Sequence, residues 1–167
     1  MTRSRPMTFL AGAAVIPLAA LAVAGCGGGG GGASAATAPP KTTNGAPATV
    51  GVAKTGLGKI LVDSRGHTLY LFKKDTRTKS ACFGACAAAW PPLRASGKPT
   101  VGTGLSAAKV GTIKRSDGRP QVTYNHHPLY RYVADARAGQ VNGQGVTAFG
   151  ASWFVLSPAG NQISRQP

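Results

Sequence analysis

Leu-Tyr-Leu-Phe-Lys-Lys-Asp, at residues 69–75, is echoed by Leu-Tyr-Arg-Tyr-Val-Ala-Asp at residues 129–135. Both stretches read Leu-Tyr-x-aromatic-x-x-Asp. Each follows an extended run and a turn, and each precedes a loop of small residues and then a tryptophan, Trp90 or Trp153. Similarity at a fixed period predicts two copies of one structural unit that pack on each other.

Each copy has the alternation of a β-strand that forms part of a hairpin. Tyr70 and Phe72 are two residues apart and share one face of the strand, as Tyr130 and Tyr132 do in the second copy. Because isolated hairpins are rarely stable, the two copies should pack together. The sequence therefore predicts a small, mainly β, single domain of two equivalent repeats. Six side chains should form a shared aromatic core: Tyr70, Phe72, Trp90, Tyr130, Tyr132 and Trp153.

The rest of the domain reads as short elements. Paired strands are expected at residues 110–115 and 121–125, an apolar strand at 152–157 and a final short strand at 162–164. The alanine-rich stretch at 83–90 predicts one or two helical turns, because the prolines that follow it end a helix.

Asp75 and Asp135 end the two repeated strands. We expect each carboxylate to accept backbone N–H groups and to order the loop after it. Catalysis or cation binding is the alternative. No second acid lies near either residue in sequence, which favours the structural role.

Cys82 and Cys86 form an even pair once Cys26 is assigned to lipid, as described below. Outside the cytoplasm such a pair is expected to form a disulfide. A loop this small gives only ~2 kcal/mol by the loop-entropy formula, so the bond would pin a local turn. The alternative is a thiol redox pair or a soft-metal site, although the spacing is Cys-x-x-x-Cys and not the Cys-x-x-Cys of redox motifs.

The N-terminus has the pattern of a bacterial lipoprotein signal. Arg3 and Arg5 precede an uncharged stretch at residues 7–25, which ends in Val23-Ala24-Gly25 before Cys26. This predicts a signal peptide at 1–25, lipidation of Cys26 and a location on the outer face of the cell membrane. A membrane-spanning helix is the alternative, since the stretch is long enough. The proline within it and the glycine run after it argue against that helix.

Residues 26–55 are rich in Gly, Ala, Pro and Thr, lack large apolar side chains and are expected to be a flexible tether. The folded domain is then expected at 56–167, with the first repeat at about 58–94 and the second at about 119–157.

The charge is strongly one-sided, with 19 Lys and Arg against four acids and a formal net charge of +15. Such a surface attracts polyanions. Outside the cytoplasm, anionic lipid headgroups or wall polymers are the expected partners, and nucleic acid is not. The alternative is a solvated basic face with no defined ligand. No feature of the sequence identifies a protein partner.

Enzyme motifs for nucleophilic serine, phosphate-binding loops or zinc helices do not occur in the sequence. His67, His126 and His127 lie in predicted turns, and a metal site needs three or four ligands. We therefore expect no catalytic residue, no metal and no cofactor.

The motifs together resemble a known family. Tyr-x-[Phe/Trp/Tyr]-x-x-Asp occurs at 70–75 and 130–135, with Cys-Phe-Gly-Ala-Cys at 82–86, Trp-Pro-Pro-Leu at 90–93 and Asn-Gly-Gln-Gly at 142–145. This combination is similar to the bacterial lipoproteins described as a secreted repeat of unknown function, over about residues 58–160. The resemblance implies a secreted or lipid-anchored duplicated module without an established activity. We expect a non-catalytic binding or scaffold module of the cell envelope; a redox or metal-handling lipoprotein that uses Cys82 and Cys86 is the alternative.

Overall fold

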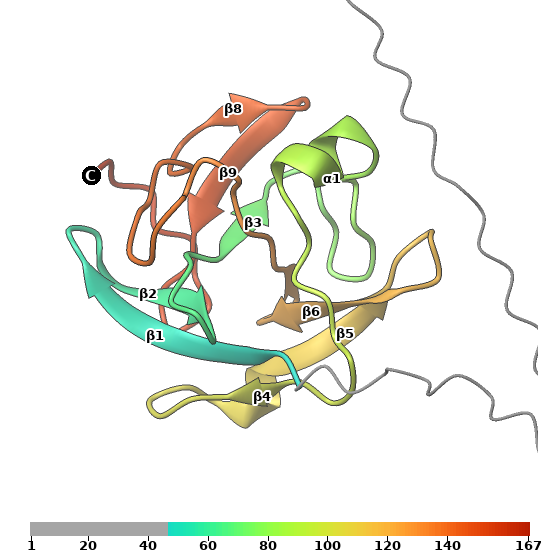
Figure 1. Cartoon of the computed structure of the whole chain (residues 1–167), viewed down its shortest axis with the longest axis horizontal. Helices are drawn as coiled ribbons and strands as arrows, with labels where there is room; N and C mark the ends of the chain where they lie inside the picture. Colours follow the sequence, from blue (N-terminus) through green and yellow to red (C-terminus); the bar gives the residue numbers. More distant parts are fainter. Residues whose placement is uncertain (1–46) are drawn as a thin grey trace, which may run out of the picture. The chain divides into compact units, whose positions relative to one another are not determined.

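The computed structural model describes residues 47–167. The predicted signal peptide, Cys26 and most of the predicted tether lie outside these residues. The described part forms short strands, one α-helix and one turn of 3-10 helix (Figure 1). None of its helices is long and apolar enough to cross a membrane. In chain order the elements are β1 Thr49–Thr55, β2 Gly58–Asp63, β3 Tyr70–Phe72, α1 Ala85–Ala89, β4 Thr100–Val101, the 3-10 helix Ala107–Lys109, β5 Val110–Lys114, β6 Pro120–Tyr124, β7 His127–Pro128, β8 Thr147–Ala148 and β9 Ala151–Val155.

The strands form three small sheets, in the orders β2-β1-β4, β3-β9-β8 and β5-β6-β7. Most pairs are antiparallel, and β4 runs parallel to β1. This confirms the mainly β fold. The predicted strand pair around residue 117 is the β5–β6 hairpin, in which Val110 pairs with Tyr124 and Lys114 with Pro120.

The domain begins earlier than the sequence predicted. Thr49–Thr55 is strand β1, which pairs along its length with β2, so the tether boundary at residue 55 is wrong. The segment Thr-Val-Gly-Val-Ala-Lys-Thr has weak apolar character, and only Val50 in it is fully buried. Strand pairing holds it in place, and composition alone does not show that.

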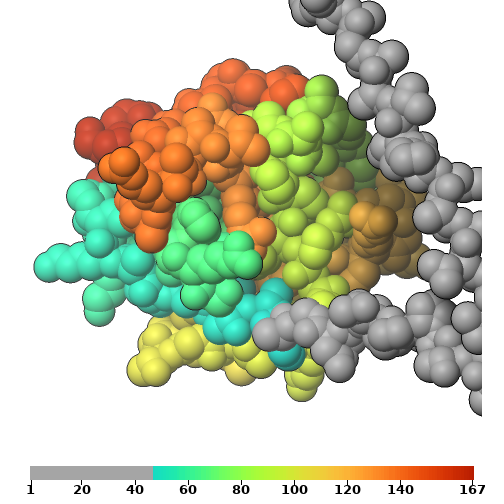
Figure 2. All heavy atoms as spheres, in the orientation of Figure 1, coloured from blue at the N-terminus to red at the C-terminus, as the bar shows by residue number. Residues whose placement is uncertain are grey.

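The two repeats exchange strands. β3 of the first repeat pairs with β9 of the second, with Tyr70 opposite Val155 and Phe72 opposite Trp153. In return, the segment after Leu129 pairs with the segment after Ala89: Leu93 N–H donates to Leu129 at 2.8 Å and Val133 N–H to Ala89 at 3.1 Å. The space-filling view shows the yellow-green surface around residues 85–95 next to the orange surface around 130–145 (Figure 2). Each repeat is therefore completed by the other.

The core has two clusters, one on each side of the repeated strands. The aromatic cluster contains Tyr70 and Phe72, whereas Leu69 and Leu71 belong to an aliphatic cluster. This is the two-face alternation expected of a strand. Since strands such as β3 bury both faces, the domain forms two core clusters despite its small size.

Local sequence explains the helix and one of the turns. α1 is alanine-rich and stops before Pro91, which has no N–H to continue it. Between β6 and β7 lie Asn125 and His126, both with positive φ (47° and 67°), as a two-residue hairpin loop of type I′ requires.

The predicted strand at 162–164 is reduced to one bridge, between Leu156 and Gln162. The carbonyl oxygens of Ile163 and Arg165 accept instead from the side chain of Gln144, at 2.7 and 2.8 Å. A side-chain amide thus takes the place of a strand partner.

Candidate functional site

The two motif tyrosines meet at the centre of the domain. Tyr70 N–H donates to the carbonyl of Tyr130 at 2.9 Å, and Tyr130 N–H donates back at 3.0 Å. Because the two residues occupy the same position in the two repeats, the repeats face each other across a local pseudo-two-fold axis.

The motif aspartates are exchanged across this axis. The Tyr70 hydroxyl donates to Asp135 at 2.6 Å, and the Tyr130 hydroxyl donates to Asp75 at 2.7 Å. The other oxygen of Asp75 accepts the N–H of Ala81 at 2.7 Å, and that of Asp135 accepts the N–H of Asn142 at 2.9 Å. Each carboxylate therefore orders the loop after it and also binds the tyrosine of the other repeat. The sequence predicted the contact of each aspartate with its own loop. It did not predict the contact with the tyrosine, because the aspartate and the tyrosine belong to different copies of the motif.

Burial governs the titration of these groups. It raises the pKa of Asp75 to about 6, against the N–H of Ala81, the hydroxyl of Tyr130 and the charge of Arg115, which lower it. Burial also raises the pKa of Asp135, although Tyr70 and Asn142 donate to it. Neutral donors hold both carboxylates; Asp135 is buried and Asp75 is half-buried.

The six predicted aromatic side chains come together in the core. Trp90 and Trp153 stack on each other with ring centroids 4.0 Å apart, and Tyr132 and Phe72 stack on their outer faces at 4.0 and 4.1 Å. Tyr70 contacts Trp90 edge-on at 5.3 Å, and Tyr130 contacts Trp153 edge-on at 5.2 Å. Five of the six rings are buried and Tyr132 is half-buried. These rings are core, so they do not form an aromatic binding groove.

The two repeats differ at the loop that follows each aspartate. In the first repeat the loop contains the Cys82–Cys86 disulfide, and both sulfur-bearing residues are buried. In the second repeat the corresponding position is Gly143, whose N–H donates to the Tyr70 hydroxyl at 3.2 Å. An added Cβ on Gly143 would lie 2.7 Å from the ring of Trp90, so the aromatic core itself fills this loop. Ala81 N–H donates to Asp75 as Asn142 N–H donates to Asp135, so Ala81 is the counterpart of Asn142 and Cys82 that of Gly143.

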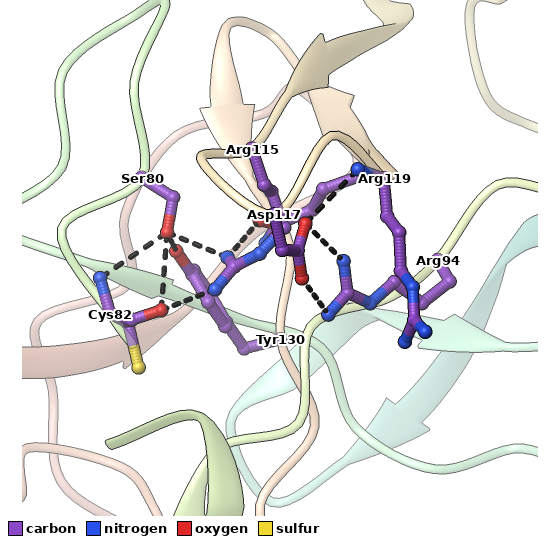
Figure 3. Close-up of polar contacts among 8 residues, drawn as sticks. Ser80, Cys82, Arg94, Arg115, Asp117, Arg119 and Tyr130 are labelled. Atoms are coloured by element: carbon purple, nitrogen blue, oxygen red, sulfur yellow. Dashed lines mark hydrogen bonds and ion pairs between the residues drawn. The ribbon is translucent and has the colours of Figure 1, made fainter. Parts of the chain in front are cut away.

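Arg115 is buried beneath the first of these loops, with only 4% of its surface exposed. Its Nη1 donates to Ser80 Oγ at 2.7 Å and to Gln121 at 2.6 Å, and its Nη2 donates to the carbonyl of Cys82 at 2.5 Å (Figure 3). Ser80 Oγ lies 2.7 Å from the Tyr130 hydroxyl. A polar chain therefore links the arginine to the buried tyrosine and, through it, to Asp75.

This guanidinium has no carboxylate of its own. Asp75 and Asp117 respond to its charge, yet within residues 47–167 no acid lies at ion-pair distance from it. Asp117 pairs with Arg94 at 2.9 Å. The Nε of Arg115 is buried and has no hydrogen-bond partner in the described residues.

A cavity of about 450 Å³ opens beside this arginine; we call it the Arg115 cavity. The ring of Phe83 lies over the guanidinium, 4.7 Å from its centre, and 41% of the Phe83 surface is exposed. No acid lines the cavity. Its lining residues are Lys79, Ser80, Phe83, Lys114, Arg115 and Ser116.

A second polar cavity, of about 400 Å³, has an acid in its wall. Asp63 accepts from Arg131 Nε at 2.5 Å and from the N–H groups of Arg65 and His67. Burial alone would raise the pKa of Asp63, but these donors outweigh it and hold the pKa below its ordinary value. This carboxylate neutralises Arg131 and leaves the second cavity less cationic than the Arg115 cavity.

A third cavity, of about 840 Å³, lies between the edge strands β4 and β5. Its wall includes Gly97, Val101, Ala107 and Gly111, and its one charged lining residue is Lys98. It offers few groups that would orient a ligand.

The histidines do not converge with other metal-ligating groups. His67 lies 3.6 Å from Asp63, while His126 lies in the β6–β7 turn and His127 begins β7. Burial and the neighbouring charges of Lys73 and His126 lower the pKa of His127. In the described residues no group of three or more His, Cys, Asp or Glu side chains is placed to hold a metal ion.

The exposed charge is almost entirely positive. Asp117 is the one exposed acid in residues 47–167, and it is paired with Arg94. Asp63 and Asp135 are buried and Asp75 is half-buried. The exposed basic residues are Lys54, Lys59, Arg65, Lys73, Lys74, Arg77, Lys79, Lys98, Lys114, Arg119, Arg137 and Arg165.

Comparison with known proteins gives one match. A family model described as a secreted repeat of unknown function matches residues 51–94 and again residues 111–157. The matched ranges include most of β1 and of β5, so each copy carries most of the leading hairpin as well as the tyrosine motif. No curated protein and no solved structure matches the chain.

Proposed function

The chain belongs to the lipoprotein family described as a secreted repeat of unknown function, and from that membership we propose that it is a non-catalytic binding module of the cell envelope. The proposed ligand class is an anionic envelope component that carries phosphate groups, in a wall polymer or a lipid headgroup. The proposed anchor is a lipid on Cys26, which holds the module at the outer face of the cell membrane.

One observation carries the binding proposal: the acids are used inside the domain while the bases stay on its surface. Asp75 and Asp135 hold tyrosines and loops, and Asp63 holds Arg131. The exposed charged residues are Lys and Arg side chains and one acid, Asp117, which is paired with Arg94. A surface of one sign attracts polyanions over a wide area.

Buried polar groups support a binding role over a catalytic one. A nucleophile and its base must stand within hydrogen-bond reach of each other and of substrate. The motif carboxylates and tyrosines meet each other and not a cavity. Arg115 is buried next to a cavity and can bind an anion, but it has no base beside it. Asp63 is buried next to the second cavity and is paired with Arg131.

Binding is tested with the mature chain, made without lipid as Cys26→Ser, and a poly(glycerol phosphate) probe. We expect binding at low salt and a steep fall in affinity as NaCl rises from 50 to 500 mM, because exposed charges are screened at short range. Vesicles of phosphatidylglycerol and of phosphatidylcholine distinguish a headgroup from a polymer as the source of phosphate. No binding to any anionic probe at 50 mM NaCl would refute the proposal.

The anchor is tested in cells by labelling with an alkynyl fatty acid. The wild-type chain should take up the label and fractionate with membranes, whereas Cys26→Ser should lose the label and leave the membrane fraction. Label on the Cys26→Ser chain would show that the lipid is attached elsewhere.

The alternative, a redox or metal-handling lipoprotein, rests on Cys82 and Cys86. It requires thiols that solvent can reach under mild reducing conditions. The measurement that separates it from the binding proposal is given with the disulfide prediction below.

A further inference from the structure

The two leading hairpins, β1–β2 and β5–β6, each bury one side chain at the tip, and this side chain is apolar in the first hairpin and charged in the second. At the tip of β1–β2, Leu57 is fully buried in the aromatic cluster. The C-terminal segment covers this tip: Arg165 donates to the carbonyl of Leu57, and Gln144 donates to the carbonyls of Ile163 and Arg165. At the tip of β5–β6, the buried side chain is Arg115, and a cavity adjoins it.

A buried guanidinium with only neutral acceptors is an unusual arrangement. Burial of a charge costs free energy unless a partner of opposite sign compensates it. The acceptors of Arg115 are the hydroxyl of Ser80, the amide of Gln121 and the carbonyl of Cys82, which satisfy hydrogen bonds but carry no charge. An anion in the adjoining cavity would supply the missing charge.

The rim of the cavity has the groups that an anion needs. Lys79 and Lys114 are exposed on two different segments, and no ion pair engages either of them in the described residues. Ser116 adds a hydroxyl. The half-exposed ring of Phe83 gives one wall an apolar face, which suits the carbon skeleton next to a phosphate ester. The volume of about 450 Å³ exceeds by an order of magnitude the ~30 Å³ that one water occupies.

We propose that the Arg115 cavity is a phosphate-binding subsite, in which Lys79 and Lys114 hold one phosphate of the anionic ligand above Arg115 and the adjoining glycerol or sugar lies on Phe83. This inference deepens the proposed function and rests on it. It assigns the phosphate of the ligand to the Arg115 cavity, although basic residues are spread over much of the surface.

The test uses ¹H–¹⁵N spectra of the mature Cys26→Ser chain, titrated with inorganic phosphate and with glycerol 3-phosphate. We expect saturable shifts at 79–83 and 114–116, and tighter binding of glycerol 3-phosphate because it also reaches Phe83. In Lys79→Ser/Lys114→Ser, two charge-assisted contacts are removed and the affinity should fall at least about tenfold.

The matched control is Lys54→Ser/Lys59→Ser, which removes the same charge from the β1–β2 hairpin. In it the affinity for glycerol 3-phosphate should stay within about twofold, because only diffuse attraction is reduced. Arg115→Lys, checked for an unchanged fold by its spectrum, should weaken phosphate binding without the loss of core packing that Arg115→Ala would cause.

Two results would overturn the subsite. One is unchanged binding in Lys79→Ser/Lys114→Ser, and the other is an equal loss in both double variants, which would show diffuse attraction only. In either case salt-sensitive binding of poly(glycerol phosphate) would still support the proposed function. Absence of polymer binding in the wild-type chain would instead remove the proposed function.

Discussion

The loops after Asp75 and Asp135 have the same contacts with the core but are closed by different residues. Both present an N–H to the aspartate that precedes them and both close over the aromatic stack. The first is closed by the Cys82–Cys86 disulfide, and the second by Gly143, packed against Trp90 and Tyr70. Both copies keep the hydrogen bond between tyrosine and aspartate and the stack of rings, which indicates that the fold requires these features. The way the loop is closed differs between the two copies.

The largest effect is expected where the two halves are most alike. Trp90→Ala and Trp153→Ala should each lower the free energy of unfolding by about 3–5 kcal/mol, because each removes a large buried ring from the stack. Chemical denaturation of the two variants measures this. If the losses of unfolding free energy in the two variants differ by more than about half of the larger one, the two halves are not equivalent.

The next effect separates the two loops. Gly143→Ala should cost about 1–3 kcal/mol, because the new Cβ would lie under 3 Å from the rings of Trp90 and Tyr70. Gly97→Ala is the control, since nothing lies within 4 Å of the Cβ it would add. Thermal unfolding compares them. Equal stability of the two variants would mean that the aromatic core does not fill the second loop.

Removal of the disulfide should affect the first loop alone. Cys82→Ala/Cys86→Ala should lose ~2 kcal/mol by loop entropy, with amide exchange rising at 76–84 and unchanged at 136–145. The companion measurement is a thiol count on the Cys26→Ser chain, in which Cys82 and Cys86 are the two remaining cysteines, before and after reduction. Because both cysteines are buried, we expect two thiols only after strong reduction. Release under mild reductant would favour the redox alternative.

The last effect is a dependence on pH. Burial raises the pKa of Asp75 from 3.8 to about 6, so the folded chain binds more protons than the unfolded chain between these values. The stability that this protonation contributes is fully present below about pH 4 and is lost as pH rises through about 6. The wild-type chain should therefore lose stability relative to Asp75→Asn over this window, as measured by denaturation at several pH values.

Asp117→Asn gives the control of opposite sign. Hydrogen bonds from Arg94 and from the N–H of Arg119 lower the pKa of Asp117, so its contribution is lost as pH falls. The two variants should differ from the wild type with opposite slopes. A flat difference for Asp75→Asn would show that its carboxylate is not the titrating group.

Much of the fold was present in the repeated motif. The alternation of Leu69 and Leu71 with Tyr70 and Phe72 predicted the two-faced strand, and the alanine run before Pro91 predicted α1. The exchange of strands between repeats was not predictable, because two identical motifs pair equally well within a copy or between copies on local grounds. β1 was missed because strand pairing rather than apolar content holds it.

The candidate site was less visible. The sequence predicted that Asp75 and Asp135 order loops, which their backbone contacts show. The burial of Arg115 had no signal, since an arginine before a Ser-Asp-Gly turn is ordinarily exposed. The one hint was Leu57, an apolar residue at the tip of the first hairpin. When the two hairpins are aligned, the tip of the second hairpin has Arg115 where an apolar residue would be expected.

The exchange of strands also sets when the chain can fold. Phe72 pairs with Trp153, and Tyr70 with Val155, so β3 lacks its partner strand β9 until the second repeat has been synthesised. Pairings this distant in sequence form slowly. In this secreted family member the sheet that contains β3 can therefore close only after both repeats have been synthesised, and neither repeat completes its fold alone.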